Sequence, residues 1–600
     1  MNKVWCGPPP ESRVRVPIKL LTPMSAITPT QFSRRAYVLF AVMLAVALVI
    51  ILRLGYWQIV QYPALSAAVA TNRERDIKEP ARRGDILTAD GVLLATDIYF
   101  YEITAHPPLI NDPKEQAQLL APILNMSETK LVEMLSDKSQ TTVMLTKTAP
   151  ATAGRQLTAL RNKRKINAIE FYEKPSRQYP NLTLAAQVVG FVSGDRKGAY
   201  GVEQYNNELL TGRDGVIHAE ADALGDEILP FDFPKGSPAV DGDTLVLTLN
   251  SALQNIAERE LKRGVQEFGA KSGQILILEP ATGKILALAG YPSPDLNAYA
   301  TTDMSAYVNP FVSMPYEPGS VFKAITLAAG LDSEKIAPNT ILNDTGSVTI
   351  GGRTIYNSDR QGYGNVDLVK AMAKSLNVIA AKIALATGPK SFYQYLHDFG
   401  FGVNTGVELA GEIPGTVKNP GDGVWYESDL GTNSFGQGIA VTPLQMANAL
   451  AVIANGGNLM RPYIVDRVIR ANGTVEQRSP SVVRRVLKPE TAKQVTDILS
   501  RSILTESTNR ARLDGYTIAG KTGTAQIPIP GGYDPKWTIA SFGGYFPADN
   551  PQYVILVKID SPKKSPWGSQ VASPIFAEVA KGIAQLTGLP PDDVRKAMSK

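Results

Sequence analysis

A serine and a lysine three residues apart begin an apolar stretch near the middle of the chain. The stretch "EPGSVFKAITLAAG" places Ser320 directly after Pro318-Gly319 and Lys323 one turn later, and the residues that follow are almost all apolar. In a helix this spacing puts both side chains on one face, about 5–6 Å apart at Cβ. Burial removes hydration from a lysine and lowers its pKa, so that the neutral amine can accept a serine proton. The pattern predicts a nucleophilic Ser320 with Lys323 as its base.

The spacing by itself is not specific, because the chain carries Ser-x-x-Lys at two other places. Ser127 and Lys130 lie in a stretch that is typical of a polar helix, and Ser561 and Lys564 lie in the Pro- and Lys-rich "DSPKKSPWG". Solvation at the surface accounts for both of these pairs. For Ser320 the alternative is a capping serine beside a lysine that extends to solvent.

Two further short patterns follow Ser320 along the chain. The stretch "KSLNVIAAKIA" places Ser375 and Asn377 at the head of a second apolar helix, and "AGKTGTAQI" places Lys521-Thr522-Gly523 within a strand. Each pattern occurs once more, at 507–509 in a polar loop and at 271–273 before an early strand. Only one set runs in the order Ser-x-x-Lys, Ser-x-Asn, Lys-Thr-Gly, and the ordered set indicates acyl transfer by a serine nucleophile.

The elements that must position these residues are visible in the periodicity of the second half. An amphipathic helix from Ser251 to about Phe268 precedes "QILILEPATGKILALAGYP", whose two apolar runs around 281–283 predict a hairpin. Three strand-like runs, "YTIAGKTGTAQI", "WTIASFGGYF" and "QYVILVKID", come before a helix from Val571 to about Gln585. Two early and three late strands, with helices between and after them, predict an α+β domain built on an antiparallel sheet.

An uncharged apolar run from Ala36 to Leu52 is followed by Arg53 and by the interfacial residues Tyr56 and Trp57. This pattern predicts one transmembrane helix. Because a basic tail precedes it, the positive-inside rule places the N-terminus in the cytoplasm and the rest outside. The alternative is a cleaved signal peptide with "AVA" at 68–70 as its cleavage site, but the run is longer than the usual apolar region of about 7–15 residues.

Charge and composition limit the functions that the chain could have. The net charge is +5, and it all lies in residues 1–35, since the remaining residues carry equal numbers of basic and acidic side chains. This balance argues against a nucleic-acid-binding surface. The one cysteine, Cys6, falls in the predicted cytoplasmic tail, and the three histidines are scattered. We therefore expect no disulfide outside the membrane, no metal site and no cofactor.

With these motifs the chain resembles the class B penicillin-binding proteins, the monofunctional D,D-transpeptidases of peptidoglycan synthesis. The resemblance extends to "RRGDILTADGVLLA", where Thr88-Ala89 replace the commoner Asp-Arg, and to "YGVEQYNNELLTGRDG", "EPATGKILALAGYPSPDLN" and "SFGQGIAVTPLQMANALAVIANGG". It implies a transpeptidase domain, with a five-stranded antiparallel sheet and helices on both sides, on an extended mixed α/β pedestal.

Together with the Pro/Gly/Asp-rich passage "PFDFPKGSPAVDGD", the resemblance divides the chain into five parts. The expected parts are a cytoplasmic tail at 1–35, a transmembrane helix at 36–60, a dimerisation-type pedestal at 63–245, a transpeptidase domain at 246–588 and a C-terminal tail at 589–600. The protein would then be a single-pass protein of the cytoplasmic membrane with an extracytoplasmic catalytic domain.

The resemblance also implies catalytic roles. Ser320 would attack the carbonyl between the two D-alanines of a stem peptide, and Lys323 would be its base. Ser375 and Lys521 would relay the proton to the leaving amine. An amino group of a neighbouring stem peptide would then take the acyl group, and β-lactams would acylate the same serine.

The substrate-binding residues that the resemblance implies are Asn377, Thr522, Gly523 and Thr524. Asn377 would hydrogen-bond the substrate amide, and Thr522 would bind its terminal carboxylate. Gly523 would let the substrate lie along the strand edge, and the backbone N–H groups of Ser320 and Thr524 would form the oxyanion hole. Family members work with a SEDS-type glycosyltransferase, and the short pedestal without cysteine favours the division-type FtsI/SpoVD group.

Other functions are consistent with some of the same residues. A β-lactamase would need a base that activates water, for which Glu408 and Glu412 are candidates, but it has no use for a pedestal and an anchor. A silent scaffold or antibiotic sensor conflicts with the intact motifs, and a bifunctional enzyme lacks sequence for a glycosyltransferase. A Ser-His-Asp triad would require His397 beside Ser320, and we expect a packed or surface histidine instead. For Trp567 we expect loop packing rather than a place at the substrate entrance.

Overall fold

The computed structural model describes residues 29–65, 74–221, 227–228, 235–507 and 509–598. The chain divides into two compact units, Met1–Ile77 with Ile217–Gly236, and Lys78–Val216 with Ser237–Lys600. Most of the predicted tail at 1–35, including Cys6, and the "AVA" site at 68–70 lie outside the described residues.

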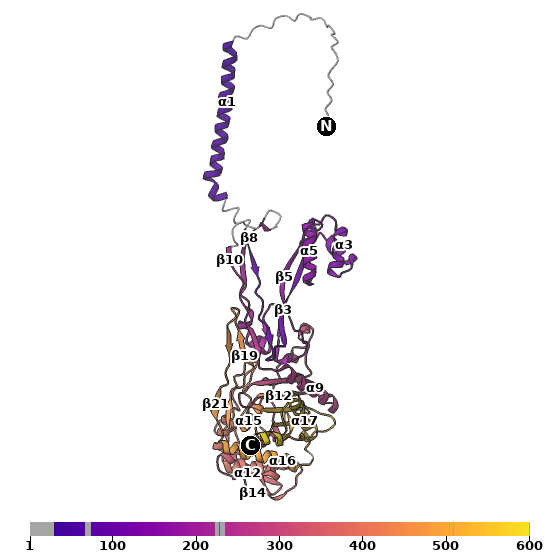
Figure 1. The fold of residues 1–600 in the computed structure, drawn as a ribbon, viewed down its shortest axis with the longest axis vertical. Coiled ribbons are helices and arrows are strands. Elements are labelled where there is room, and N and C mark those ends of the chain that lie inside the picture. The colour runs from indigo at the N-terminus through magenta and orange to yellow at the C-terminus, as the bar shows by residue number, and fades with distance from the viewer. Residues whose placement is uncertain (1–28, 66–73, 222–226, 229–234, 508, 599–600) are drawn as a thin grey trace, which may run out of the picture. The chain divides into compact units, whose positions relative to one another are not determined.

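The first unit contains the predicted transmembrane helix. Helix α1 (Pro29–Gly55) continues into the π-helical turn η1 (Tyr56–Val60), so the helix begins before the predicted start at residue 36 (Figure 1). The segment Arg34–Val60 is long and apolar enough to cross a membrane, and its side chains are unpacked. A helix of a soluble core would bury such residues, so the exposure favours a membrane span. A small sheet has the order β1-β8-β10, with β9 paired to β8, formed by Glu74–Glu79, Gly215–Ala221, Lys235–Ser237 and Glu227–Ile228.

The second unit is built on a five-stranded antiparallel sheet, which confirms the predicted fold class. Its order is β13-β12-β24-β23-β22, formed by Ile285–Tyr291, Ser272–Leu278, Tyr553–Asp560, Gly532–Phe546 and Ala519–Ile529. Because side chains alternate along a strand, Ile275 and Ile277 enter one hydrophobic core and Leu276 and Leu278 the other.

Helices cover both faces of this sheet. Helices α9 (Ser251–Phe268) and α17 (Gly568–Thr587) pack on one face. The other face is covered by η5 (Gly319–Phe322), α10 (Lys323–Asp332), α15 (Pro443–Ala454) and α16 (Pro489–Thr505). Helices α11 (Leu368–Ala373) and α12 (Asn377–Thr387) pack on α16 and α10, followed by α13 (Pro389–Asp398) and α14 (Glu427–Asn433).

Three small hairpins or strand pairs surround this helical part: β14 with β17 (Ile341–Asp344, Gly364–Asp367), β15 with β16 (Ser347–Ile350, Arg353–Tyr356) and β18 with β21 (Asn458–Met460, Val482–Arg485). Short 3-10 turns η3 (Leu296–Ala298) and η4 (Met304–Tyr307) precede the site. Helix α18 (Asp592–Met598) lies in the predicted C-terminal tail, and Thr517 donates its N–H to the Asp592 carboxylate at 2.7 Å, which holds the helix on the domain.

The predicted pedestal contains a second sheet, of order β20-β19-β11-β2-β3-β4, with β5 paired to β3. Its strands are Val475–Gln477, Val465–Ile469, Thr244–Leu247, Ile86–Leu87, Leu93–Ala105, Val143–Pro150 and Ile169–Gln178. Strand β11 pairs in parallel with β2 and antiparallel with β19, so the sheet includes strands from both sides of the predicted boundary at 245/246. That boundary therefore stays a prediction.

Strands β3 and β5 extend to the helices of the pedestal, α3 (Pro113–Leu124), α4 (Glu128–Ser136) and α5 (Ala151–Asn162) (Figure 1). The turn η2 (Pro107–Leu109) precedes α3. The remaining elements are α6 (Ala186–Val189), β6 (Phe191–Val192), β7 (Gly198–Ala199), α7 (Gly201–Tyr205) and α8 (Asn207–Thr211).

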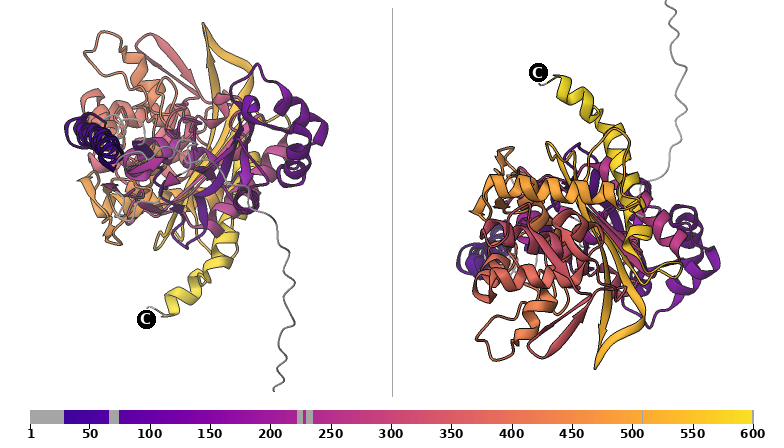
Figure 2. Two further views of the ribbon diagram at one scale, coloured as in Figure 1. Left: turned by 90° about the horizontal axis from the view of Figure 1, so that it is seen from above. Right: turned by 90° about the horizontal axis from the view of Figure 1, so that it is seen from below.

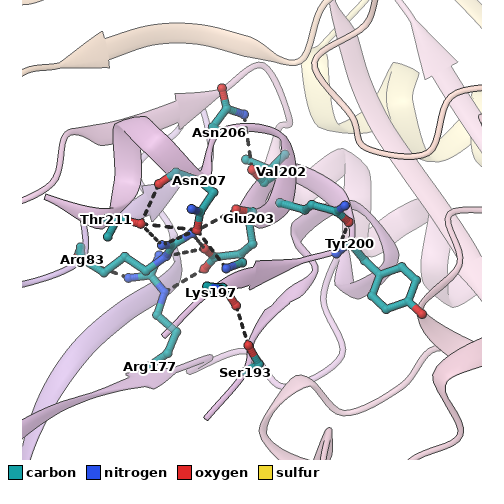
Figure 3. A network of polar contacts seen from close by, with 12 residues as sticks. Arg83, Arg177, Ser193, Lys197, Tyr200, Val202, Glu203, Asn206, Asn207 and Thr211 are labelled. Atoms are coloured by element: carbon teal, nitrogen blue, oxygen red, sulfur yellow. Dashed lines mark hydrogen bonds and ion pairs between the residues drawn. The ribbon is translucent and has the colours of Figure 1, made fainter. Parts of the chain in front are cut away.

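A buried ionic network joins the two pedestal motifs that were recognised in the sequence (Figure 3). Arg83, from "RRGD", pairs with Glu203, from "YGVEQ", at 2.6 Å, and Arg177 of β5 donates its Nε to the same carboxylate at 2.8 Å. The Arg83 Nη1 also donates to the Thr211 hydroxyl at 2.8 Å. Removal of one partner of a buried pair costs about 3–5 kcal/mol because it leaves a buried charge unpaired, so loss of any one of these charged residues would destabilise the pedestal. Thr88, at a position where the resemblance leads one to expect Asp, accepts the Val92 N–H at 2.9 Å and closes the turn between β2 and β3.

Candidate active site

The apolar run after Ser320 forms the helix that the sequence predicts, with one local difference. Ser320 lies in the short 3-10 turn η5, and Lys323 is the first residue of α10. Gly319 has φ +56°, which favours glycine, and a Cβ there would lie 3.1 Å from the Ala525 Cβ of β22. The turn therefore brings Ser320 close to the strand that carries Lys521.

Ser375 lies in the link between α11 and α12, and Asn377 begins α12. Ser375 has φ +54°, a left-handed conformation that costs a residue with a side chain about 1–3 kcal/mol and is found at functional sites. Asn377 is the first residue of α12, and its Nδ2 donates to the Tyr356 carbonyl oxygen at 2.9 Å. The amide is thereby oriented with its oxygen toward Lys323.

Three sequence segments meet at the Ser375 hydroxyl. The Lys323 Nζ is 3.1 Å from Ser375 Oγ and 2.5 Å from the Ser375 carbonyl oxygen, and it donates to Asn377 Oδ1 at 2.8 Å. The Lys521 Nζ lies 3.0 Å from the same Ser375 Oγ and 3.2 Å from Thr522 Oγ1. One hydroxyl between two amines provides a path for a proton from one lysine to the other.

Burial changes the protonation of both lysines. Lys323 is 0% exposed, and burial, with a smaller contribution from the charge of Lys521, lowers its pKa well below the usual value. Burial lowers the pKa of Lys521 to about 7, while the negative charge of Glu506 acts in the opposite direction. Two buried amines this close resist carrying two charges, so a neutral amine is available at neutral pH.

A cleft of about 950 Å³ exposes these groups to a ligand. Of the predicted site residues, Ser320, Ser375, Asn377, Lys521, Thr522 and Thr524 line the cleft. Lys323 is buried behind them and reaches the cleft through its hydrogen bonds to Ser375 and Asn377.

Gly523 faces the protein interior. A Cβ at this position would lie 2.3 Å from Ser541 Oγ and 2.8 Å from Val321 Cγ2. The packing of η5 on the sheet therefore already requires glycine here. Its predicted role in substrate binding stays a prediction.

The structure shows where Trp567 and His397 lie relative to the cleft. Trp567 borders the cleft and is 48% exposed, which corrects our expectation of loop packing. His397 hydrogen-bonds Asn419 Oδ1 at 2.8 Å and is not among the residues of the cleft, as we expected.

Glu408 and Glu412 are held by backbone groups outside the cleft. Glu408 accepts the Ile464 N–H at 3.0 Å. Glu412 accepts the N–H groups of Thr405 and Gly406 at 2.7 and 3.0 Å. Both carboxylates thus have structural partners, and neither lines the cleft beside Ser320.

The sequence did not point to several charged residues of the cleft. Arg353, Asp359, Arg360, Lys374, Glu506 and Lys536 all line it. Lys374 pairs with Glu506 at 3.0 Å and so places this carboxylate near Lys521. These six charged residues belong to no short sequence motif. The one sequence feature that could have pointed to any of them is that Lys374 directly precedes Ser375.

The charge interaction between the two lysines leads to a prediction about pH. The predicted role of Lys323 as the base requires its neutral amine, so the acylation rate should fall as the solution becomes acidic enough to protonate this amine. Since the charge of Lys521 lowers the pKa of Lys323, Lys521→Gln raises that pKa and moves the acidic limb of the rate profile to higher pH. The measurement is the acylation rate by penicillin against pH, with each profile normalised to its maximum. Lys536→Gln, which removes an exposed lysine of the same cleft, leaves the limb in place; an unmoved limb in Lys521→Gln contradicts the coupling.

Two family models match the chain. The "Penicillin binding protein transpeptidase domain" matches residues 273–581, and the "Penicillin-binding Protein dimerisation domain" matches residues 78–247. The chain is 32% identical over 572 residues to "Stage V sporulation protein D" of Bacillus subtilis, covering 93% of this chain and 86% of that protein.

Solved structures agree with this similarity. A peptidoglycan synthetase from Bifidobacterium adolescentis has a TM-score of 0.70 and 27% identity, covering 87% of this chain and 98% of that one. Penicillin-binding protein 3 of Mycobacterium tuberculosis, complexed with aztreonam, has a TM-score of 0.65 and 26% identity, covering 86% and 98%.

Proposed function

Because this chain belongs to the class B penicillin-binding proteins, we propose that it is a peptidoglycan D,D-transpeptidase in which Ser320 is the nucleophile. The observation that carries the assignment of residues is the Ser375 hydroxyl between two buried lysine amines, in the cleft that also contains Ser320. Such a constellation activates a serine without a histidine.

In the first half-reaction the Ser320 Oγ attacks the carbonyl carbon between the two D-alanines of a stem peptide. The neutral amine of Lys323 accepts the hydroxyl proton. The proton passes through Ser375, whose hydroxyl contacts Lys323 and Lys521, to the nitrogen of the leaving D-alanine. The C–N bond breaks, and the peptide remains as an ester on Ser320.

Substrate binding uses groups that line the same cleft. Asn377 orients the peptide amide, and Thr522, beside the Lys521 amine, binds the terminal carboxylate. The backbone N–H groups of Ser320 and Thr524 stabilise the oxyanion of the tetrahedral intermediate. In the second half-reaction the amine of a neighbouring stem peptide attacks the ester carbonyl carbon and gives up a proton, which passes through the lysine pair to Ser320 Oγ. The ester C–O bond breaks, the new amide bond forms the cross-link, and the Ser320 hydroxyl is restored.

The acyl-enzyme formed with penicillin is expected to persist for many minutes. A β-lactamase holds a water against a carboxylate base, whereas Glu408 and Glu412 are bound by backbone N–H groups outside the cleft. Decay of the acyl-enzyme after removal of free penicillin, together with steady-state nitrocefin hydrolysis, measures this. Glu408→Gln and Glu412→Gln should leave the decay unchanged. Turnover of about 1 per second or more, lost in either variant, would replace our proposal by the β-lactamase alternative.

We infer that this reaction takes place outside the cytoplasm. The basic residues before α1 support a cytoplasmic N-terminus, with both the pedestal and the cleft on the other side. A SEDS-family glycosyltransferase is the partner that we propose for the anchored protein. Co-purification of the two from membranes would test this, and its absence in mild detergent would argue against a stable complex.

We place the protein in cell division rather than in side-wall growth. Relatives of this chain are named "Stage V sporulation protein D" and "Peptidoglycan D,D-transpeptidase FtsI homolog". A fluorescent fusion of the full chain should therefore gather at the septum of growing cells. A fusion found along the side wall alone would contradict this role.

A further inference from the structure

Glu317 lies three residues before Ser320, and the mechanism above does not use it. It is 8% exposed and is not among the residues that line the cleft. Its Oε1 accepts the Gly438 N–H at 3.0 Å and the Tyr533 hydroxyl at 3.3 Å. A carboxylate placed in this way does not touch the substrate, so any role in the reaction must act through the groups that it holds.

These contacts join three segments around the nucleophile. The first is the nucleophile segment, 316–320, and the second is the glycine turn, 435–438. The third is the hairpin of β22 and β23, the gold ribbon that projects from the body in Figure 2.

The nucleophile segment and the glycine turn are packed with little free space. Gly319 donates its N–H to the Gly436 carbonyl oxygen at 3.1 Å, and Tyr316 and Val441 exchange two backbone hydrogen bonds of 2.9 Å. A Cβ on Gly436 would lie 2.3 Å from the Gly319 carbonyl oxygen. The backbone therefore determines the relative positions of these two segments.

The outer part of the hairpin follows an irregularity in its ladder. Its ladder is regular from Ala519 to Gln526 and shifts register between Gln526 and Pro528, after which Pro528 pairs with Tyr533. Tyr533 thus lies beyond the irregularity. Its partner Pro528 follows Thr524 by four residues along β22. The bond of Tyr533 to Glu317 attaches this outer part to the nucleophile segment.

Two observations indicate what the Glu317 side chain contributes. Both described donors point to one oxygen, and the other, Oε2, is buried with no partner among the described residues. Burial raises the pKa of this carboxyl group, and the Gly438 and Tyr533 donors oppose that rise. An uncharged amide oxygen could accept the same two hydrogen bonds.

We propose that Glu317 is a positioning residue for acylation. Its carboxyl oxygen joins the β22–β23 hairpin, through Tyr533, to the nucleophile segment, which the backbone already holds against the glycine turn. In this way Glu317 helps to set the distance between the two backbone N–H groups of the oxyanion hole, on Ser320 and Thr524. This inference rests on the proposed function, because it assumes that acylation occurs at Ser320. An oxyanion hole acts only when its donors are held in place before the reaction, so a displacement well below 1 Å is enough to slow the chemical step.

The test is stopped-flow acylation of the full chain in detergent by a fluorescent penicillin, which separates the rate constant for acylation from the affinity of the initial complex. Glu317→Ala should lower the acylation rate constant about 10- to 100-fold and leave the affinity of the initial complex unchanged. This decrease is no larger than the decrease caused by removing one donor of an oxyanion hole. Glu317→Gln keeps the acceptor oxygen and should remain within about threefold of wild type. Tyr533→Phe should give a smaller decrease than Glu317→Ala.

Glu412→Ala is the matched control, because it also removes a carboxylate that accepts backbone N–H groups, but away from the cleft. It should acylate at the wild-type rate. The proposal is overturned if Glu317→Ala acylates normally, if Glu317→Gln is as slow as Glu317→Ala, or if Glu412→Ala is equally slow. If Glu317→Ala does not fold, Tyr533→Phe tests the proposal instead. An unchanged acylation rate constant in Tyr533→Phe would show that the bond between the hairpin and Glu317 does not affect acylation, and would overturn the proposal. A wild-type chain that is not acylated at all contradicts the proposed function instead.

Discussion

The variant Ser320→Ala is expected to lose all covalent labelling by fluorescent penicillin. Among the residues that the structure describes, Ser320 is the one serine that lines the cleft and is followed three residues later by a fully buried lysine. The ester needs the Ser320 oxygen, so its removal abolishes the product rather than slowing it. Labelling of the full chain, followed by mass spectrometry of the labelled peptide, measures the effect and identifies the residue.

The two other Ser-x-x-Lys serines supply matched controls. Ser127 caps α4 by accepting the Lys130 N–H at 3.4 Å, and Ser561 follows β24, outside the residues of the cleft. Ser127→Ala and Ser561→Ala should label as the wild type does. Labelled peptide containing either serine, or remaining label in Ser320→Ala, would refute the assignment of the nucleophile.

The variant Lys323→Arg is expected to lower the acylation rate at least about a hundredfold, the lower end for lost general-base catalysis. Arginine keeps the positive charge but does not release a proton near neutral pH, whereas burial lowers the pKa of Lys323 well below its usual value. The larger guanidinium must also fit a site that is 0% exposed. The measurement is the acylation rate constant, with thermal unfolding of the same sample as a check on folding.

Lys564→Arg, which changes the exposed lysine of another Ser-x-x-Lys pair, is the control for Lys323→Arg and should not change the rate. A folded Lys323→Arg protein that acylates at nearly the wild-type rate would show that Lys323 is a packing or electrostatic residue. In that case Lys521, with a pKa of about 7, becomes the remaining base that contacts Ser375.

Local patterns in the sequence predicted much of the fold. The amphipathic period of 251–268 predicted α9, and the paired apolar runs around 281–283 predicted the hairpin of β12 and β13. These predictions succeed because helical and strand periods are properties of neighbouring residues. The three late strands and α17 follow in the same way, although α17 begins at Gly568 rather than at Val571.

Other features of the fold could not be read from local patterns. Strand β11 pairs with β2 and with β19, more than 150 residues apart along the chain and on the two sides of a predicted domain boundary. The middle position of β24 in the five-stranded sheet is likewise a matter of tertiary pairing. Strand partners at such separations depend on which faces can be buried together, and no short stretch encodes that choice.

For the site, the sequence by itself determined the residue types, their spacing and their order. That information predicted Ser320, Lys323, Ser375, Asn377 and Lys521 as site residues, because the ordered set Ser-x-x-Lys, Ser-x-Asn and Lys-Thr-Gly is typical of acyl transfer by a serine nucleophile. What only the tertiary structure decided is how they meet. The Ser375 hydroxyl contacts a lysine 52 residues before it and another 146 residues after it. The depression of both lysine pKa values, the burial of Gly523 and the contacts of Glu317 also depend on segments that become neighbours only when the core closes, because desolvation and hydrogen bonding are set by the surroundings of a side chain in space.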